Sequence, residues 1–135
     1  MLALPANTKI WLGLEPVDMR KSFDGLCGVV LGSLDGDPYS GDVFVFFNRR
    51  RTLVKLMLWD GNGFWLFYKR LEQGTFEDLR ATHAGNTVRI NRAKLAMLLE
   101  GIDMKKSQFR NHYVRSIRIG GGDGETRDNQ RRASG

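Results

Sequence analysis

Three consecutive arginines are the residues of this chain best suited to binding chemistry. Arg49, Arg50 and Arg51 lie between two apolar runs, where Gly, Asn or Asp would form a turn more readily. Guanidinium groups donate paired hydrogen bonds to phosphate oxygens, so three of them at an exposed hairpin tip would suit a nucleic-acid backbone. The alternative is a solvated loop whose charges discourage aggregation at the end of a sheet. Other candidate contacts follow along the same hairpins: Lys55, Lys69 and Arg70.

Side chains that could support catalysis do not form a recognisable constellation. His83 and His112 are far apart in the sequence, and neither has a second ligand at the spacing of a metal site. Asp18 and Asp24 are six positions apart, which would place them on different sides of a helix. The sequence has no phosphate-binding glycine loop and no serine elbow. We therefore expect a protein that is not an enzyme and that uses no cofactor and no metal. A metal-dependent nuclease assembled through folding is the less favoured alternative.

The arginines belong to a stretch of predicted strands, Val43–Arg70. Val43–Phe47, Leu53–Trp59 and Phe64–Tyr68 are apolar and rich in β-branched and aromatic residues, and short links join them, which predicts an antiparallel meander. Asp60–Gly63 supplies the residue types of a tight hairpin turn. Because the runs do not alternate with polar residues, we expect both faces of the sheet to be covered. We interpret the aromatic residues of these strands as core, rather than as platforms for bases: Phe44, Phe46, Trp59, Phe64, Trp65 and Phe67.

Two amphipathic patterns predict helices that cover this sheet. The first has Asp18 as its N-cap and continues to about Leu34, with apolar residues at spacings of three and four. Its glycines weaken it, or mark a close approach to the sheet. The second covers Arg92–Glu100, with Asn91 as its N-cap and Gly101 at its end.

Thr8–Leu14 and Thr87–Ile90 are predicted to be further strands. The expected fold class is α+β, with an antiparallel meander sheet covered by two helices in a single small domain, residues 1–103. Residues 104–135 are basic and end in a polar, glycine-containing run, which predicts a flexible tail. The tail contains three more candidate contacts for nucleic acid: Lys105, Lys106 and Arg110.

Charge and cysteine content indicate the partners and the compartment. The 135-residue chain has 21 Lys and Arg against 15 Asp and Glu, a formal net charge of +6. Residues 1–102 contribute +2 and residues 103–135 contribute +4, which favours a nucleic acid or an anionic surface as partner. The single cysteine, Cys27, cannot form an internal disulfide, and no secretion signal or apolar run of about 20 residues is present. We expect a cytoplasmic protein, with nucleoid association as one setting, and no membrane partner.

Several ordered segments resemble one protein family. They are Asp18–Leu26, Asp37–Gly41, Val43–Arg51, Leu56–Gly61, Leu71–Phe76 and Leu95–Asp103. Together they are similar to the accessory protein of insertion-sequence-66-type bacterial transposons. That protein is the product of the second open reading frame, also called TnpB, and is unrelated to the RNA-guided nuclease of the same name. The resemblance runs from about Thr8 to Asp103, with Glu77–Asn86 unmatched. The tail beyond it is either an element-specific arm for DNA or dispensable.

The resemblance implies a small accessory protein of DNA transposition that works beside a separate, larger transposase, which carries the DNA-cutting carboxylates. It supplies no catalytic residues. From the residues themselves, we expect Arg49–Arg51 and Lys55 to hold DNA phosphates, which give affinity with little choice of sequence. We expect an apolar or sheet-edge surface to contact the transposase or a second copy of the chain. The main alternative is an interaction module whose basic loop binds an acidic patch of the transposase without touching DNA.

Overall fold

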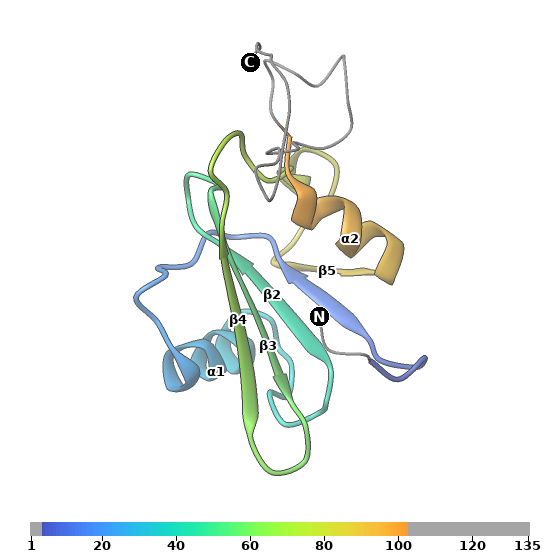
Figure 1. Ribbon diagram of the computed structural model, residues 1–135. Helices are drawn as coiled ribbons and strands as arrows, with labels where there is room; N and C mark the ends of the chain where they lie inside the picture. The colour runs from blue at the N-terminus through green and yellow to red at the C-terminus, as the bar shows by residue number, and fades with distance from the viewer. Residues whose placement is uncertain (1–3, 103–135) are drawn as a thin grey trace, which may run out of the picture. The chain divides into compact units, whose positions relative to one another are not determined.

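The computed structural model describes residues 4–102, in which a five-stranded sheet has a helix on each face (Figure 1). Its strands are arranged in the order β4-β3-β2-β1-β5, so β4 and β5 are the edges. The strands are β1 (Ile10–Gly13), β2 (Val43–Phe47), β3 (Leu53–Trp59), β4 (Phe64–Arg70) and β5 (Thr87–Ile90). The helices are α1 (Phe23–Gly32) and α2 (Arg92–Glu100), with a short 3-10 helix, η1 (Leu79–Ala81), between β4 and β5. The predicted tail, with Lys105, Lys106 and Arg110, lies outside the described residues.

Strands β2, β3 and β4 form the predicted antiparallel meander. β3 and β4 pair along their whole length, from Leu53 opposite Arg70 to Trp59 opposite Phe64. The turn between them closes with a 3.0 Å hydrogen bond from the Asp60 N–H to the Gly63 carbonyl. The φ of Gly61 is 111°, a conformation that residues with a Cβ rarely adopt. The predicted hairpin is therefore confirmed.

Strand β1 makes the sheet mixed rather than fully antiparallel. It lies between β2 and β5, with Ile10 opposite both Val43 and Ile90. The pairing with β2 is parallel and the pairing with β5 is antiparallel. Parallel neighbours need a long crossover, which α1 and its flanking loops supply. The α+β class is confirmed, and the sheet remains mostly antiparallel.

Alternate residues of β2 face two separate cores, so both faces of the sheet are buried. Val43, Val45 and Phe47 belong to the core that contains Leu95 and Leu98 of α2. The intervening residues belong to the core that α1 covers, whose buried members are Leu26, Val30, Leu34, Phe44, Phe46 and Met57. This two-sided burial explains why the strands lack alternating polar residues.

Helix α1 begins later than the sequence predicts. Its N-cap is Ser22, whereas Asp18 lies in a preceding turn in which the Asp18 carbonyl accepts a 3.1 Å hydrogen bond from the Lys21 N–H. The position of Asp18 as N-cap is therefore wrong. The suggested close approach at the glycines is also wrong for Gly28 and Gly32, because a Cβ added to either would contact nothing within 4 Å.

Helix α2 matches its prediction. The Asn91 side-chain oxygen accepts a 2.8 Å hydrogen bond from the Lys94 N–H, as an N-cap should. Gly101 ends the helix with a φ of 77°. Among residues 4–102, no helix is both long enough and apolar enough to cross a bilayer.

Candidate nucleic-acid interface

The three arginines lie in the loop that joins β2 to β3, and Asn48 holds this loop in shape. The Asn48 side-chain oxygen accepts hydrogen bonds from the backbone N–H groups of Thr52 and Leu53, each at 2.9 Å. The Asn48 carbonyl accepts a third bond, at 3.2 Å, from the N–H of Arg51. Arg51 has a φ of 61°, in the left-handed region that glycine adopts more easily.

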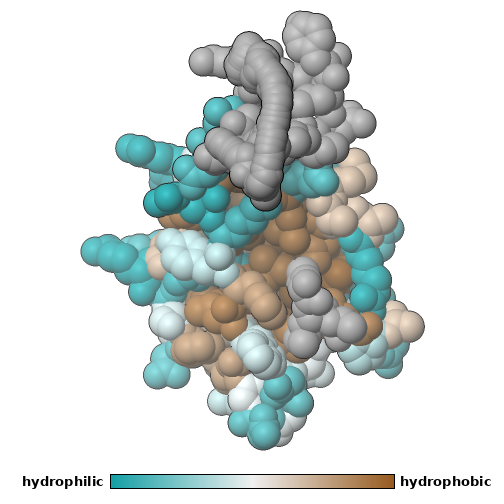
Figure 2. All heavy atoms as spheres, in the orientation of Figure 1, coloured by the Kyte–Doolittle hydropathy of each residue, from teal (hydrophilic) through white to brown (hydrophobic). Residues whose placement is uncertain are grey.

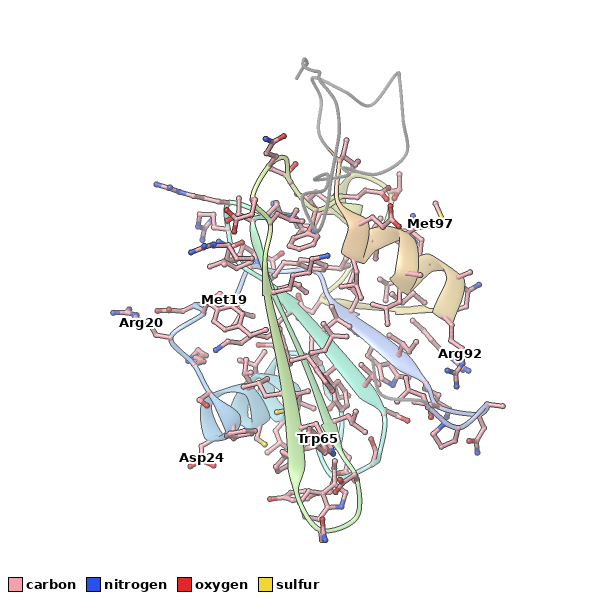
Figure 3. The ribbon with its side chains drawn as sticks, in the orientation of Figure 1. Met19, Arg20, Asp24, Trp65, Arg92 and Met97 are labelled. Atoms are coloured by element: carbon pink, nitrogen blue, oxygen red, sulfur yellow. The ribbon has the colours of Figure 1, made fainter. Side chains whose placement is uncertain are left out.

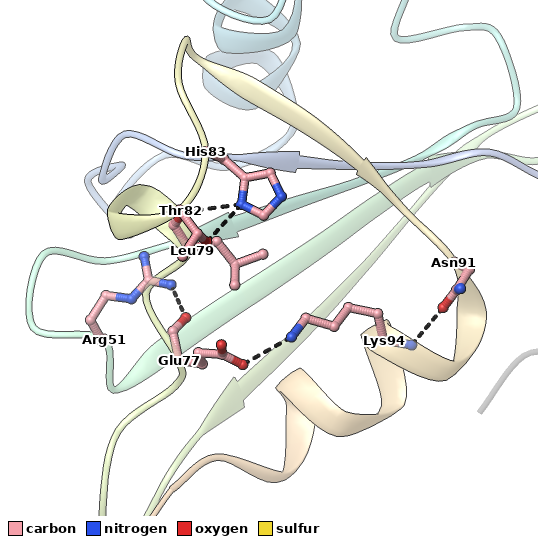
Figure 4. Close-up of polar contacts among 7 residues, drawn as sticks. All are labelled: Arg51, Glu77, Leu79, Thr82, His83, Asn91 and Lys94. Atoms are coloured by element: carbon pink, nitrogen blue, oxygen red, sulfur yellow. Dashed lines mark hydrogen bonds and ion pairs between the residues drawn. The ribbon is translucent and has the colours of Figure 1, made fainter.

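Arg51 points into the protein. The residue is 8% exposed, and its guanidinium carbon lies 4.3 Å from the centre of the Phe47 ring. The guanidinium donates a hydrogen bond to the Glu77 carbonyl (Figure 4). The Arg51 carbonyl accepts a 2.7 Å bond from the Phe76 N–H, so the residue fastens the loop to the segment before η1. Burial lowers the pKa of the Arg51 guanidinium. The expectation that all three arginines lie at an exposed tip is therefore wrong for Arg51.

Arg49 and Arg50 lie at the exposed part of the loop, as predicted. Neither side chain makes a hydrogen bond or ion pair with another residue in the part of the chain that the structure describes. Their guanidinium groups therefore have free hydrogen-bond donors as far as residues 4–102 are concerned, on a loop whose backbone Asn48 holds in place.

Lys55 is committed to the interior. It is 6% exposed, and its ammonium group donates to the carbonyls of Met19 and Lys21 at 2.8 and 2.7 Å. The ammonium also lies 4.6 Å from the centre of the Tyr68 ring. These contacts fasten the loop before α1 to β3, and they leave Lys55 little freedom to reach a phosphate.

Lys69 and Arg70, the other candidates on β4, are exposed but have internal partners. The Lys69 ammonium donates a 2.7 Å hydrogen bond to the Leu99 carbonyl at the end of α2. Arg70 forms a 3.1 Å ion pair with Glu72. The structure does not bring these two residues together with Arg49 and Arg50 in one cleft.

The loop before α1 lies beside the arginine loop instead. The Val17 N–H donates a 2.8 Å hydrogen bond to the Phe47 carbonyl at the end of β2. An open cleft of about 400 Å³ lies between the two loops, with Arg49 and Arg50 on one side and Val17 on the other. Next along the chain, Arg20 projects away from the sheet with 91% of its side chain exposed (Figure 3).

One carboxylate, Asp18, lines this cleft, and Arg20 largely neutralises it. The Arg20 guanidinium lies 2.7 Å from the Asp18 carboxylate, and hydrogen bonds from the Arg20 side chain and backbone lower the pKa of Asp18 to about 2. Lys21 follows and is also exposed. We call Asp18, Arg20, Lys21, Arg49 and Arg50 the tip surface; it carries four cations and one carboxylate.

Arg20 and Lys21 were missed from the sequence because Asp18 was placed at the start of the helix. Ser22 is also a residue type that caps helices, and starting the helix there would have left both basic residues in a loop. The loop that contains them lies beside the arginine loop because of the Val17–Phe47 hydrogen bond, which no local pattern predicts.

Titratable side chains elsewhere do not gather into a metal site within residues 4–102. No group of three His, Cys, Asp or Glu side chains there could hold a metal ion. The His83 Nδ1 atom lies 3.0 Å from the Thr82 hydroxyl and 3.3 Å from the Leu79 carbonyl, in a local turn around η1 (Figure 4).

Comparison with known proteins identifies the family. A family model described as IS66 Orf2 like protein matches residues 8–109. This chain belongs to that family. It is 36% identical to y4hO, an uncharacterized protein of Sinorhizobium fredii (strain NBRC 101917 / NGR234). The 108 aligned residues are 80% of this chain and 92% of the relative. A second uncharacterized protein of the same strain, y4jC, is 38% identical over 76 residues, 56% of this chain and 65% of the relative. No solved structure gives a significant match.

Membership of the IS66 Orf2-like family supports an accessory role in transposition and confirms the resemblance found in the sequence. This family is not a known enzyme family. The match continues beyond Asp103 and therefore includes Lys105 and Lys106, whereas Arg110 lies just outside it. It also includes the segment 77–86, which contributes η1 and the Glu77 carbonyl bound by Arg51.

Proposed function

We propose that this chain is a non-catalytic accessory protein of transposition that holds DNA by its phosphates at the tip surface, beside the transposase of the same element. Family membership supports the role in transposition. The observation that supports the proposed DNA contact is the difference among the three arginines. The Arg51 guanidinium is buried and donates to the Glu77 carbonyl, while Arg49 and Arg50 are exposed and have no partner among the described residues. The setting we propose is the bacterial cytoplasm, where DNA is available.

The geometry of the tip surface suits phosphates better than bases. Guanidinium forks match phosphate oxygens, and two of them on one loop can contact the backbone without entering a groove. The Asn48 hydrogen bonds fix the loop beforehand, so less conformational freedom is lost on binding. Such contacts give affinity that depends on salt and little on sequence.

Fluorescence anisotropy of a labelled DNA duplex, titrated at several salt concentrations, tests the proposal. The test variant is Arg49→Ala/Arg50→Ala. The control is Arg89→Ala/Arg92→Ala, which removes the same charge from exposed residues on β5 and α2. We expect the test variant to bind about tenfold or more weakly at low salt and to reduce the slope of log affinity against log salt by about 2, because each phosphate contact contributes about 0.9. The control should keep the wild-type slope.

Two results would contradict the tip surface as the DNA site. One is wild-type protein that does not bind duplex even at low salt, which would direct attention to an acidic surface of the transposase. The other is a test variant that binds like the control, while a chain truncated after Asp103 binds weakly. That pattern would assign the contact to the tail with Lys105, Lys106 and Arg110.

A further inference from the structure

Within residues 4–102, strand β4 is an edge of the sheet, and its pairing with β3 shows which of its backbone groups are left open. The Leu71 N–H donates to the Thr52 carbonyl at 2.9 Å, and the Asp60 N–H donates to the Gly63 carbonyl at 3.0 Å. In an antiparallel pair the bonded positions alternate, so residues 65, 67 and 69 direct their N–H and C=O groups toward β3. The N–H and C=O groups that face the open edge belong to Phe64, Leu66, Tyr68 and Arg70.

Strand β4 exposes two aromatic side chains, Trp65 and Tyr68. Trp65 is 46% exposed and Tyr68 is 56% exposed, so the interpretation of Trp65 as a core residue is wrong. The rings of Trp65 and Phe67 stack with their centres 6.0 Å apart and their planes 11° from parallel. Figure 2 shows hydrophobic residues reaching the surface between β4 and α2. Exposed aromatic residues are enriched at the centres of protein interfaces, whereas solitary edges are usually short, charged or covered.

We propose that β4 pairs with β4 of a second copy of this chain, antiparallel and centred on Phe67. In this register Phe64 of one copy lies opposite Arg70 of the other, and Leu66 lies opposite Tyr68. These are the positions with outward N–H and C=O groups, so every open group of the strand finds a partner. Moving the centre to Leu66 leaves Arg70 unpaired, and moving it to Tyr68 leaves Phe64 unpaired.

The same register makes the side chains complementary. Trp65 lies opposite Lys69 of the other copy at a non-hydrogen-bonded position, where facing side chains are closest. On the other face of the sheet Phe64 lies opposite Arg70. Both pairs set a cation against an aromatic ring, and each occurs twice in the symmetric dimer. To make them, Lys69 and Arg70 exchange their contacts with the Leu99 carbonyl and with Glu72. Lys69 and Arg70 stay near opposite ends of the joined strands, so like charges do not face one another.

The resulting dimer has one continuous sheet of ten strands. The two-fold axis of an antiparallel pair is perpendicular to the sheet, so the two α1 helices lie on one face and the two α2 helices on the other. The interface is isologous and closes on itself, which ends assembly at two copies. The dimer does not depend on DNA binding by the tip surface.

The mass of the full chain in solution, measured by light scattering over a wide range of protein concentration, gives the first test. We expect twice the 15.3 kDa of one chain at the upper concentrations. Tyr68→Pro removes one outward N–H without breaking a bond to β3, and should shift the protein to monomer. Tyr68→Thr removes the same ring but keeps the N–H, and should remain more dimeric than Tyr68→Pro.

A pair of substitutions at Trp65 distinguishes this register from general hydrophobic association. Trp65→Lys places two lysines opposite one another and should give monomer, whereas Trp65→Glu faces Lys69 and should retain the dimer. If only the lost ring mattered, both variants would dissociate equally. Adding Lys69→Glu to Trp65→Lys should restore the dimer.

Cysteine crosslinking reports the register directly. In a Cys27→Ala background, Phe67→Cys places two thiols across the two-fold axis at a spacing of about 4.5 Å between Cα atoms, which a disulfide can bridge. Trp65→Cys is the matched control, since the two copies of residue 65 lie on opposite sides of the axis. We expect rapid disulfide-linked dimer from the first variant and little from the second.

A wild-type chain that stays monomeric at every concentration would overturn the proposal, including the case in which another part of the same chain covers β4. A dimer that survives both Tyr68→Pro and Trp65→Lys would also overturn it, because association would then use another surface. Far-ultraviolet circular dichroism of each variant checks that loss of the dimer is not loss of the fold.

Discussion

Arg49, Arg50 and Arg51 are identical side chains in consecutive positions, yet the fold gives them two different roles. Arg49 and Arg50 face solvent, whereas Arg51 is held between the Phe47 ring and the Glu77 carbonyl. From the sequence, a basic loop between two strands could be predicted. The sequence could not separate the three arginines, because the partner that takes Arg51 inward lies 26 positions later.

We expect Arg51 to matter for stability more than for DNA affinity. Arg51→Ala removes the stacking on Phe47 and the hydrogen bond to Glu77 but keeps the unfavourable φ of 61°, so it should lower the free energy of unfolding by about 2–3 kcal/mol. Arg51→Gly should cost about 1 kcal/mol less, because glycine adopts this φ freely. Urea unfolding measures both variants. If Arg51→Ala kept full stability and weakened DNA binding as strongly as Arg49→Ala/Arg50→Ala, Arg51 would belong to the binding surface.

Asp78 should make the protein sensitive to acid. Hydrogen bonds from the Arg80 side chain and backbone lower the pKa of Asp78 from 3.8 to about 2. Because this pKa is lower in the folded state than in the unfolded chain, the stabilisation is present above about pH 4 and is lost as the pH falls toward 2. We expect Asp78→Asn to lose less stability than wild type over this range, as measured by urea midpoints. Parallel pH profiles for the two proteins would show that Asp78 does not contribute.

The two helices show where element boundaries can be read from sequence. The start and the end of α2 are determined by residues next to them in the sequence, and Asn91 and Gly101 have the predicted positions. At α1, Asp18 and Ser22 are both acceptable caps. Lys55 explains why α1 is capped by Ser22 and not by Asp18. Its ammonium binds the Met19 and Lys21 carbonyls and holds them outside the helix. A contact from a strand more than 30 positions away was not visible in the local pattern.

The caps give a matched pair of substitutions. Asn91→Ala removes the 2.8 Å bond to the Lys94 N–H and should lower the free energy of unfolding by about 1 kcal/mol. Ser22→Ala should cost only a few tenths of a kcal/mol, because the Ser22 side chain makes no capping hydrogen bond. Thermal or urea unfolding compares them. Equal losses would mean that the Asn91 side-chain bond adds nothing to α2.

At the scale of the whole molecule, the sequence predicted the α+β class, the meander and the cover on both faces. It did not predict the parallel pairing of β1 with β2, because strand patterns show which residues are extended and not which neighbours they choose. The exposed aromatic edge was missed for a similar reason. Phe64–Tyr68 is as apolar as Val43–Phe47 in sequence, and only the strand order shows that, among residues 4–102, one side of β4 has no neighbouring strand.

We expect a chain that ends at Asp103 to fold without the remaining residues. Residues 4–102, the part of the chain that the structure describes, already contain a buried core on each face of the sheet. The shortened chain should unfold in a single cooperative transition, with a urea midpoint close to that of the full chain. A broad transition, or a large fall in the midpoint, would show that residues beyond 103 complete the domain.

The position of β1 between β2 and β5 also bears on how the chain folds as it is synthesised. The meander joins strands that follow one another through short turns, so it can form early and at little cost in loop closure. β1 is made first, but its outer neighbour is β5, where Ile10 pairs with Ile90. While the chain is still emerging from the ribosome, β1 therefore has one open side until nearly all of the domain has been translated. A synthesis pause shortly before β5 would prolong the lifetime of this aggregation-prone edge.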